Sequence, residues 1–142
     1  MGAAIKVSGK LMIAIILAII VLSSFSLFYY HTGLRVKSIS GATDYSWEPN
    51  TLMSTMKEGF SWIRTDTNGY NNVSIPNQID ILLMGSSHME AVQVAQNENT
   101  AEVLNKILPE LNTYNIGISG HTIYRCVDNA LEAIRYFKPG GY

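Results

Sequence analysis

The chain has 142 residues, which is room for one domain of ordinary size, and its formal net charge at pH 7 is −1. From residue 31 onward, eight Lys and Arg are scattered among eleven Asp and Glu without a basic cluster, so nucleic acid is not an expected partner. The single cysteine, Cys126, cannot form a disulfide framework or a zinc cluster, and it is expected to be a small core residue. Neither metal-ligand spacing nor a Gly-x-Gly-x-x-Gly motif is present, so the sequence predicts no metal and no cofactor.

The first thirty residues are typical of a membrane anchor. The run Leu11–Tyr30 carries no charge and is long enough for a helix that spans a bilayer. Residues 1–10, with their two lysines, are expected in the cytoplasm, residues 11–30 in the membrane, and the remainder outside the cytoplasmic membrane. The alternative is a cleaved signal peptide with its cleavage site at Ser24-Phe25-Ser26. Both interpretations carry the rest of the chain across the membrane.

Residues 31–78 are predicted to form an irregular stalk or linker, because glycines and prolines interrupt the segment throughout. Within it, the apolar spacing of Thr51–Ile63 predicts a short helix. The triplet Asn72-Val73-Ser74 matches a glycosylation sequon, which matters only in a secreted eukaryotic protein.

A regular pattern begins at Ile79. Residues Ile79–Met84 form a short apolar run, as in a strand buried on both faces of a parallel sheet, and the turn Gly85–His88 follows it. Asn99 and Glu102 have the spacing of a capping box, which predicts a helix that ends near Leu108. The residues expected on the buried side of this helix are Val103, Ile107 and Leu111.

The same order then repeats. Asn112–Ile118 is predicted as a second strand, Ser119–His121 as a turn, and Thr122–Phe137 as an amphipathic helix. The inward face of that helix is expected to carry Ile123, Val127, Leu131 and Ile134. Residues 79–142 therefore predict the opening of a three-layer α/β domain, with a third strand expected next.

The two turns are expected to meet at one edge of the sheet. Ligands of open parallel sheets bind beyond the carboxyl ends of the strands, and both turns leave such ends. Gly85 permits a sharp bend after the first strand, so that Ser87 projects its hydroxyl into the crevice. The backbone N–H groups of Ser87 and Gly120 would point at a developing oxyanion.

Two sequence blocks resemble the SGNH (GDSL-like) family of hydrolases and acyltransferases. Ile81–His88 is similar to block I of that family, with Ser86 in place of the usual aspartate, and Asn115–Thr122 is similar to block II. The resemblance covers residues 79–139. It implies a flavodoxin-like fold, Ser87 as the nucleophile and Gly120 as an oxyanion donor. Ser86, His88 and His121 are the further residues expected to line the site.

The resemblance is incomplete. Block III would supply a Gly-x-Asn oxyanion donor and block V the Asp-x-x-His base, and both would fall beyond residue 142. A serine without a base is a poor nucleophile, so the chain as given is expected to be truncated and inactive. His88 and His121 are expected at the mouth of the pocket rather than as the base. A purely structural interpretation also stays open. In it, Gly85–Ser87 is a simple strand-to-helix connection, and Gly117 and Gly120 serve only backbone packing at a turn.

The sequence thus supports two functional hypotheses. The first is a membrane-anchored SGNH-type serine esterase or O-acyltransferase that acts on acyl groups of an envelope carbohydrate or polymer. It rests on the resemblance and on the anchor. The second is a non-catalytic, membrane-anchored remnant or interaction module.

Overall fold

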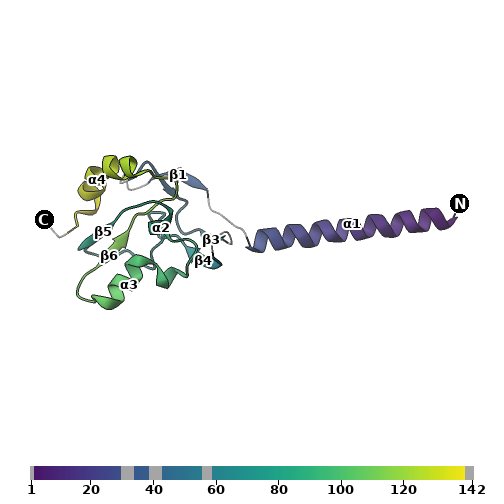
Figure 1. Ribbon diagram of the computed structural model, residues 1–142, viewed down its shortest axis with the longest axis horizontal. Coiled ribbons are helices and arrows are strands. Elements are labelled where there is room, and N and C mark those ends of the chain that lie inside the picture. The colour runs from purple at the N-terminus through teal and green to yellow at the C-terminus, as the bar shows by residue number, and fades with distance from the viewer. Residues whose placement is uncertain (1, 30–33, 39–42, 56–58, 140–142) are drawn as a thin grey trace.

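The computed structural model of the protein describes residues 2–29, 34–38, 43–55 and 59–139 (Figure 1). Helix α1 (Gly2–Tyr29) runs away from the remaining elements as a single long rod. Its window Gly9–Ser26 is long and apolar enough to cross a membrane, and none of that window is buried inside the protein. A signal sequence would meet the same criteria of length and composition. Tyr30, the last residue of the predicted span, lies outside the described residues.

The segment predicted as a stalk is not irregular where the structure describes it. It contains two antiparallel pairs, β1 with β2 and β3 with β4. These strands are β1 (Arg35–Lys37), β2 (Tyr45–Trp47), β3 (Leu52–Thr55) and β4 (Ser61–Arg64). The helix predicted over Thr51–Ile63 is therefore wrong. Burial along β4 alternates with a period of two, with Ser61 and Ile63 inward, and cross-strand packing prevails over the weak helical spacing.

The predicted parallel pairing is present. Strand β5 (Ile81–Leu83) pairs with β6 (Thr113–Asn115) in parallel, with Leu82 opposite Tyr114. Two further backbone bonds extend the pairing beyond the strands. The Ile116 N–H donates to the Leu83 carbonyl at 2.8 Å, and the Ile118 N–H donates to the Gly85 carbonyl at 3.0 Å. The carboxyl ends of the two strands therefore stay side by side into the turns that follow.

Side-chain amides close the outer edge of β6. The amide of Asn72 accepts from the Asn115 N–H and donates to the Asn115 carbonyl, both at 2.9 Å. The amide of Asn105 accepts from the Thr113 N–H at 2.7 Å and donates to the Thr113 carbonyl at 3.3 Å. Both asparagines thus take the place that a neighbouring strand would occupy, and they satisfy backbone groups that burial would otherwise leave unpaired.

Asp66 joins this edge to the core. Its carboxylate accepts from the Asn72 amide at 2.9 Å, from the Tyr114 hydroxyl at 2.8 Å and from the Tyr70 N–H at 3.1 Å. Around it lies the buried apolar cluster Tyr70, Ile79, Tyr114, Ile116, Ile118 and Ala133. Asn72 is buried with both of its amide atoms bonded, so the sequon at Asn72 is not open to modification in the folded protein.

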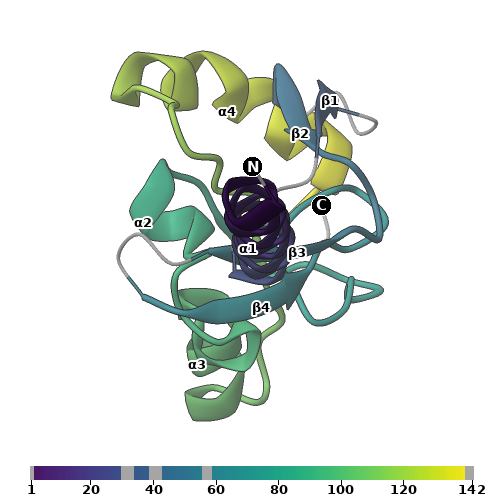
Figure 2. The same ribbon diagram turned by 90° about the vertical axis from the view of Figure 1, so that its right-hand side faces the viewer.

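Helices α3 (Thr100–Ile107) and α4 (Ile123–Phe137) lie on opposite sides of the β5–β6 pair (Figure 1). Figure 2 shows the same two helices at the bottom and the top of the view. The start of α3 is as predicted, because the Asn99 side chain accepts from the Glu102 N–H at 3.0 Å. A short helix α2 (Ser87–Glu90) and a 3-10 turn, η1 (Gln96–Glu98), connect β5 to α3. The architecture is therefore mixed α/β, with small sheets and one long N-terminal helix.

The apolar faces predicted for the two helices do not point inward. Ile123 is 75% exposed, Val127 66% and Leu131 65%, and Ile107 on α3 is also exposed. Instead α4 packs through the fully buried Ala133 and through Phe137, whose ring lies 5.0 Å from that of Tyr114. The two-stranded parallel sheet offers little surface, so α4 contacts the core through these two residues and its other large apolar side chains stay outside.

Replacing Asn72 with Asp tests the edge closure. The change keeps the shape but removes the two N–H donors and sets a second carboxylate beside Asp66, so the free energy of unfolding should fall by about 2–4 kcal/mol. Urea unfolding of the whole chain in detergent micelles, followed by tryptophan fluorescence, measures this. Asn97→Asp is the matched control, because Asn97 is exposed, and it should change stability by less than about 0.5 kcal/mol. Equal effects of the two changes would contradict the role given to Asn72.

Candidate functional site

Ser87 lies at the start of α2, directly after the turn that leaves β5. Ser86 is the residue before the helix, and its carbonyl accepts from the Met89 N–H at 3.0 Å and the Glu90 N–H at 2.9 Å. Ser87 itself is half-buried. A Cβ on Gly85 would come within 2.7 Å of the Met89 Cβ, so glycine at this position lets the helix fold back over the end of the strand.

The extension of β6 fixes α2 from the other side. A Cβ on Gly117 would lie 2.6 Å from the backbone nitrogen of Glu90, a contact that real side chains do not make. The Asn115 amide donates to the Met89 carbonyl at 2.6 Å and accepts from the Gly117 N–H at 2.8 Å. Gly117 is therefore required for close packing of the second block against the helix that begins at Ser87.

The turn after β6 places Gly120 in a left-handed conformation. The His121 N–H donates to the Ile118 carbonyl at 3.3 Å, which closes a four-residue turn. Gly120 has φ of +87° at the third position of this turn, where glycine is favoured. A Cβ there would meet only ordinary contacts, the nearest being the Tyr45 hydroxyl at 3.5 Å. The backbone conformation, rather than crowding, thus accounts for glycine at this position.

The pairing brings the two predicted turns to one edge. A backbone hydrogen bond joins Gly85 to Ile118. Ser87 lies two residues after Gly85, and Gly120 lies two residues after Ile118. Among the described residues, neither the Ser87 hydroxyl nor the Gly120 N–H has a hydrogen-bond partner in the protein. His88 is exposed to solvent.

His121 is buried beside this turn. Its ring meets the Tyr45 ring edge-on at 4.9 Å, and its Nε2 has no hydrogen-bond partner within the described part of the chain. Burial lowers the pKa of His121 from its ordinary value; nearby Arg125 and Arg35 act in the same direction, and Asp44 opposes them. The imidazole is therefore held in its neutral form at neutral pH.

Glu90 is a central residue that the sequence reasoning missed. It is 1% exposed, accepts from the Trp47 indole N–H at 2.5 Å and also accepts from the Ser119 hydroxyl. The carboxylate therefore joins α2, β2 and the Gly120 turn. One indication of this role was present in the sequence, because Glu90 lies three residues after Ser87 and therefore on the same side of a helical turn. Its burial could not be predicted, because it depends on Trp47, which is distant in sequence.

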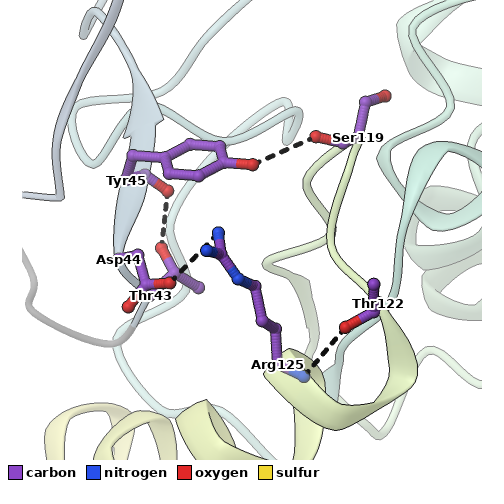
Figure 3. A network of polar contacts seen from close by, with 6 residues as sticks. All are labelled: Thr43, Asp44, Tyr45, Ser119, Thr122 and Arg125. Carbon is purple, nitrogen blue, oxygen red and sulfur yellow. Dashed lines mark hydrogen bonds and ion pairs between the residues drawn. The ribbon is translucent and has the colours of Figure 1, made fainter.

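Strand β2 and the residue before it contact the Gly120 turn and the start of α4 (Figure 3). The Tyr45 hydroxyl reaches across to donate to the Ser119 carbonyl at 3.4 Å. At the start of α4, Arg125 forms an ion pair with Asp44 at 3.5 Å. The Arg125 N–H also bonds to the Thr122 hydroxyl, which caps the helix. One contact thus connects the β2 region to the turn, and a second connects it to the helix that follows the turn.

Within the described residues, no group of three or more His, Cys, Asp and Glu is arranged to hold a metal ion. The chain matches no protein-family model, and neither curated proteins nor solved structures give a match. The interpretation of the site therefore depends on its geometry and on the two sequence blocks.

Glu90→Ala tests whether the buried carboxylate holds the site together. The change leaves the Trp47 and Ser119 donors without an acceptor, so the free energy of unfolding should fall by about 2–4 kcal/mol. Glu90→Gln keeps one acceptor and should cost about 1 kcal/mol. Chemical denaturation followed by tryptophan fluorescence distinguishes the two. Glu98→Ala, at an exposed position, is the control and should leave the midpoint unchanged.

His121 predicts a pH dependence of stability. The unfolded chain takes up a proton near the ordinary pKa of 6.5, and the folded protein resists protonation because the imidazole is buried. This contribution is therefore fully present above that value and is lost as the pH falls below it. The unfolding free energy, compared at about pH 7.5 and about pH 5.5, should decline less in His121→Gln than in the wild type. The exposed His88→Gln variant should keep the wild-type decline, and an identical decline in all three proteins would refute the assignment.

Proposed function

We propose that the chain carries the nucleophile and one oxyanion donor of a membrane-anchored serine esterase or O-acyltransferase of the SGNH type. Its substrates would be acyl groups on an envelope carbohydrate or polymer outside the cytoplasmic membrane. Helix α1 would be the anchor, since it is long and apolar enough to cross a bilayer. The observation that carries the proposal is the parallel pairing of β5 and β6, which brings the Ser87 and Gly120 turns to the same edge.

The closed edge of β6 also supports a flavodoxin-like order of strands. In the order 2-1-3-4-5, the second strand along the chain lies at the edge of the sheet, beside the first. Strand β6 is second after β5, and the Asn72 and Asn105 amides occupy its outer side. In such a fold the third strand pairs with the first strand on the side away from the second. It would therefore pair with the side of β5 that faces away from β6.

The proposed chemistry is acyl transfer through a covalent intermediate. The Ser87 oxygen attacks the ester carbonyl and passes its proton to a base, and the resulting oxyanion accepts hydrogen bonds from the backbone N–H groups of Ser87 and Gly120. The ester bond then breaks, the leaving alcohol takes up a proton, and water or a sugar hydroxyl removes the acyl group from Ser87. Within the described residues, no histidine or carboxylate bonds to Ser87, so the proposed base is a group outside this set of contacts.

The surroundings of Ser87 also favour the alternative function, because no histidine or carboxylate bonds to it among the described residues. Together with the apolar face that α4 presents to solvent, this suits a non-catalytic, membrane-anchored interaction module. The two functions differ in whether the backbone around position 87 stabilises an oxyanion, and that difference can be tested without a base.

A thiol in place of the serine hydroxyl provides the test, because a thiolate needs no general base. In a Cys126→Ser background, Ser87→Cys should be acylated by p-nitrophenyl acetate about a hundredfold faster than Ser86→Cys, compared per thiolate. The reason is that only the thiolate at position 87 attacks from a place where the Ser87 and Gly120 N–H groups face the developing charge. Stopped-flow release of p-nitrophenolate, repeated across pH, measures both rates and both thiol pKa values.

Matched controls complete this experiment. Gly120→Ala in the Ser87→Cys protein strains the turn and should remove most of the rate advantage, whereas the wild-type serine should show negligible turnover. Equal reactivity of the two thiols would favour the non-catalytic module.

A further inference from the structure

A guanidinium group lies beside the Gly120 turn, and neither sequence block accounts for it. Arg35 is directly opposite Trp47 in the β1–β2 pair. Its guanidinium carbon is 4.7 Å from the centre of the Trp47 ring and 4.9 Å from that of Tyr45. Two aromatic faces therefore hold the side chain in one place, since cations are attracted to the faces of such rings.

The aromatic contacts place the guanidinium at the proposed site. A Cβ on Gly120 would lie 3.7 Å from Arg35 Nη1 and 3.5 Å from the Tyr45 hydroxyl. The Tyr45 hydroxyl also donates to the Ser119 carbonyl, so one of the two rings that contact Arg35 is bonded to the turn itself (Figure 3). The other ring, that of Trp47, is held by its hydrogen bond to the buried Glu90.

The charge of Arg35 is not neutralised by the described part of the chain. Asp44, the nearby exposed carboxylate, is paired with Arg125. Glu90 is buried and takes its hydrogen bonds from Trp47 and Ser119. No described carboxylate is within ion-pair distance of Arg35, which is exposed to solvent. The two rings contact the guanidinium, and no described carboxylate takes up its N–H donors, so these donors stay available to a ligand.

We propose that Arg35 is an anion-binding residue of the crevice, which recognises a carboxylate or phosphate group on the polymer whose ester reaches Ser87. This inference rests on the proposed function and names its substrate class as an anionic carbohydrate or polyol phosphate. The planar fork of a guanidinium matches both groups with two parallel hydrogen bonds. The protein as a whole has a formal net charge of −1, so its overall charge does not attract anions and the attraction would be local to Arg35.

Titration of the full chain with soluble oligomers tests the proposal. The protein is placed in nanodiscs of zwitterionic lipid and carries Trp62→Phe, so that Trp47 is the remaining tryptophan. It is titrated with oligogalacturonate, with oligoglycerol phosphate and with neutral maltooligosaccharide. At least one anionic oligomer should bind about tenfold more tightly than the neutral one, and Arg35→Gln should remove that difference. Arg35→Lys should recover only part of it, because an ammonium lacks the planar fork.

Arg135→Gln is the matched control, since it removes the same charge from an exposed position on α4, about 18 Å from the start of that helix. It should leave the anion preference intact. Equal affinity for the anionic and neutral oligomers, or an unchanged preference in Arg35→Gln, overturns the proposal. Loss of binding to anionic nanodiscs in Arg35→Gln, without any oligomer preference in the wild type, overturns it as well and assigns Arg35 to lipid headgroups.

The outcome is separable from that of the proposed function. Ser87→Ala should bind the anionic oligomers like the wild type, because Arg35 acts in binding and not in the chemical step. Arg35-dependent anion binding together with equal reactivity of the thiols at positions 86 and 87 would leave an anion-binding module without catalysis. Faster acylation at position 87 without any anion preference would retain the esterase and overturn the substrate class.

Discussion

The parallel contact between β5 and β6 is the constraint on which the rest of the structure depends. A two-stranded parallel sheet leaves backbone donors and acceptors unpaired at its edges, and leaving them buried without partners is costly. In this chain the amides of Asn72 and Asn105 bond to both groups of Asn115 and Thr113. The pairing then continues to the Gly85–Ile118 hydrogen bond, and this extension sets where the two turns begin.

The segment before the sheet is structural as well as connecting. Asp66 joins Asn72 to Tyr114, so the edge closure and the aromatic core depend on one carboxylate. Strand β2 contributes Tyr45 to the Gly120 turn and Trp47 to Glu90. The candidate site is thus composite: the two sequence blocks supply its turns, and residues at least thirty positions earlier hold those turns in place.

The electrostatic character of the site follows from this arrangement. Glu90 is enclosed by two donors, and His121 stays neutral because it is buried, with its pKa lowered. In the proposed function, Arg35 of β1, which lies beside the turn, would be the charge that a ligand meets. A positive group near a backbone N–H would favour both an anionic substrate and a developing oxyanion, because both place negative charge at the same edge.

The sequence by itself determined the elements that short-range patterns encode. The charge-free run predicted α1, the Asn99–Glu102 spacing predicted the start of α3, and the two apolar runs predicted parallel strands. These features depend on local composition, capping and hydrophobic runs, which are readable without a partner. Only the tertiary structure decided the rest: the antiparallel pairs in the expected stalk, the outward faces of α3 and α4, and the burial of Glu90 and Asn72. Each of these depends on contacts between residues far apart in the chain, so no pattern within a short window contains the information.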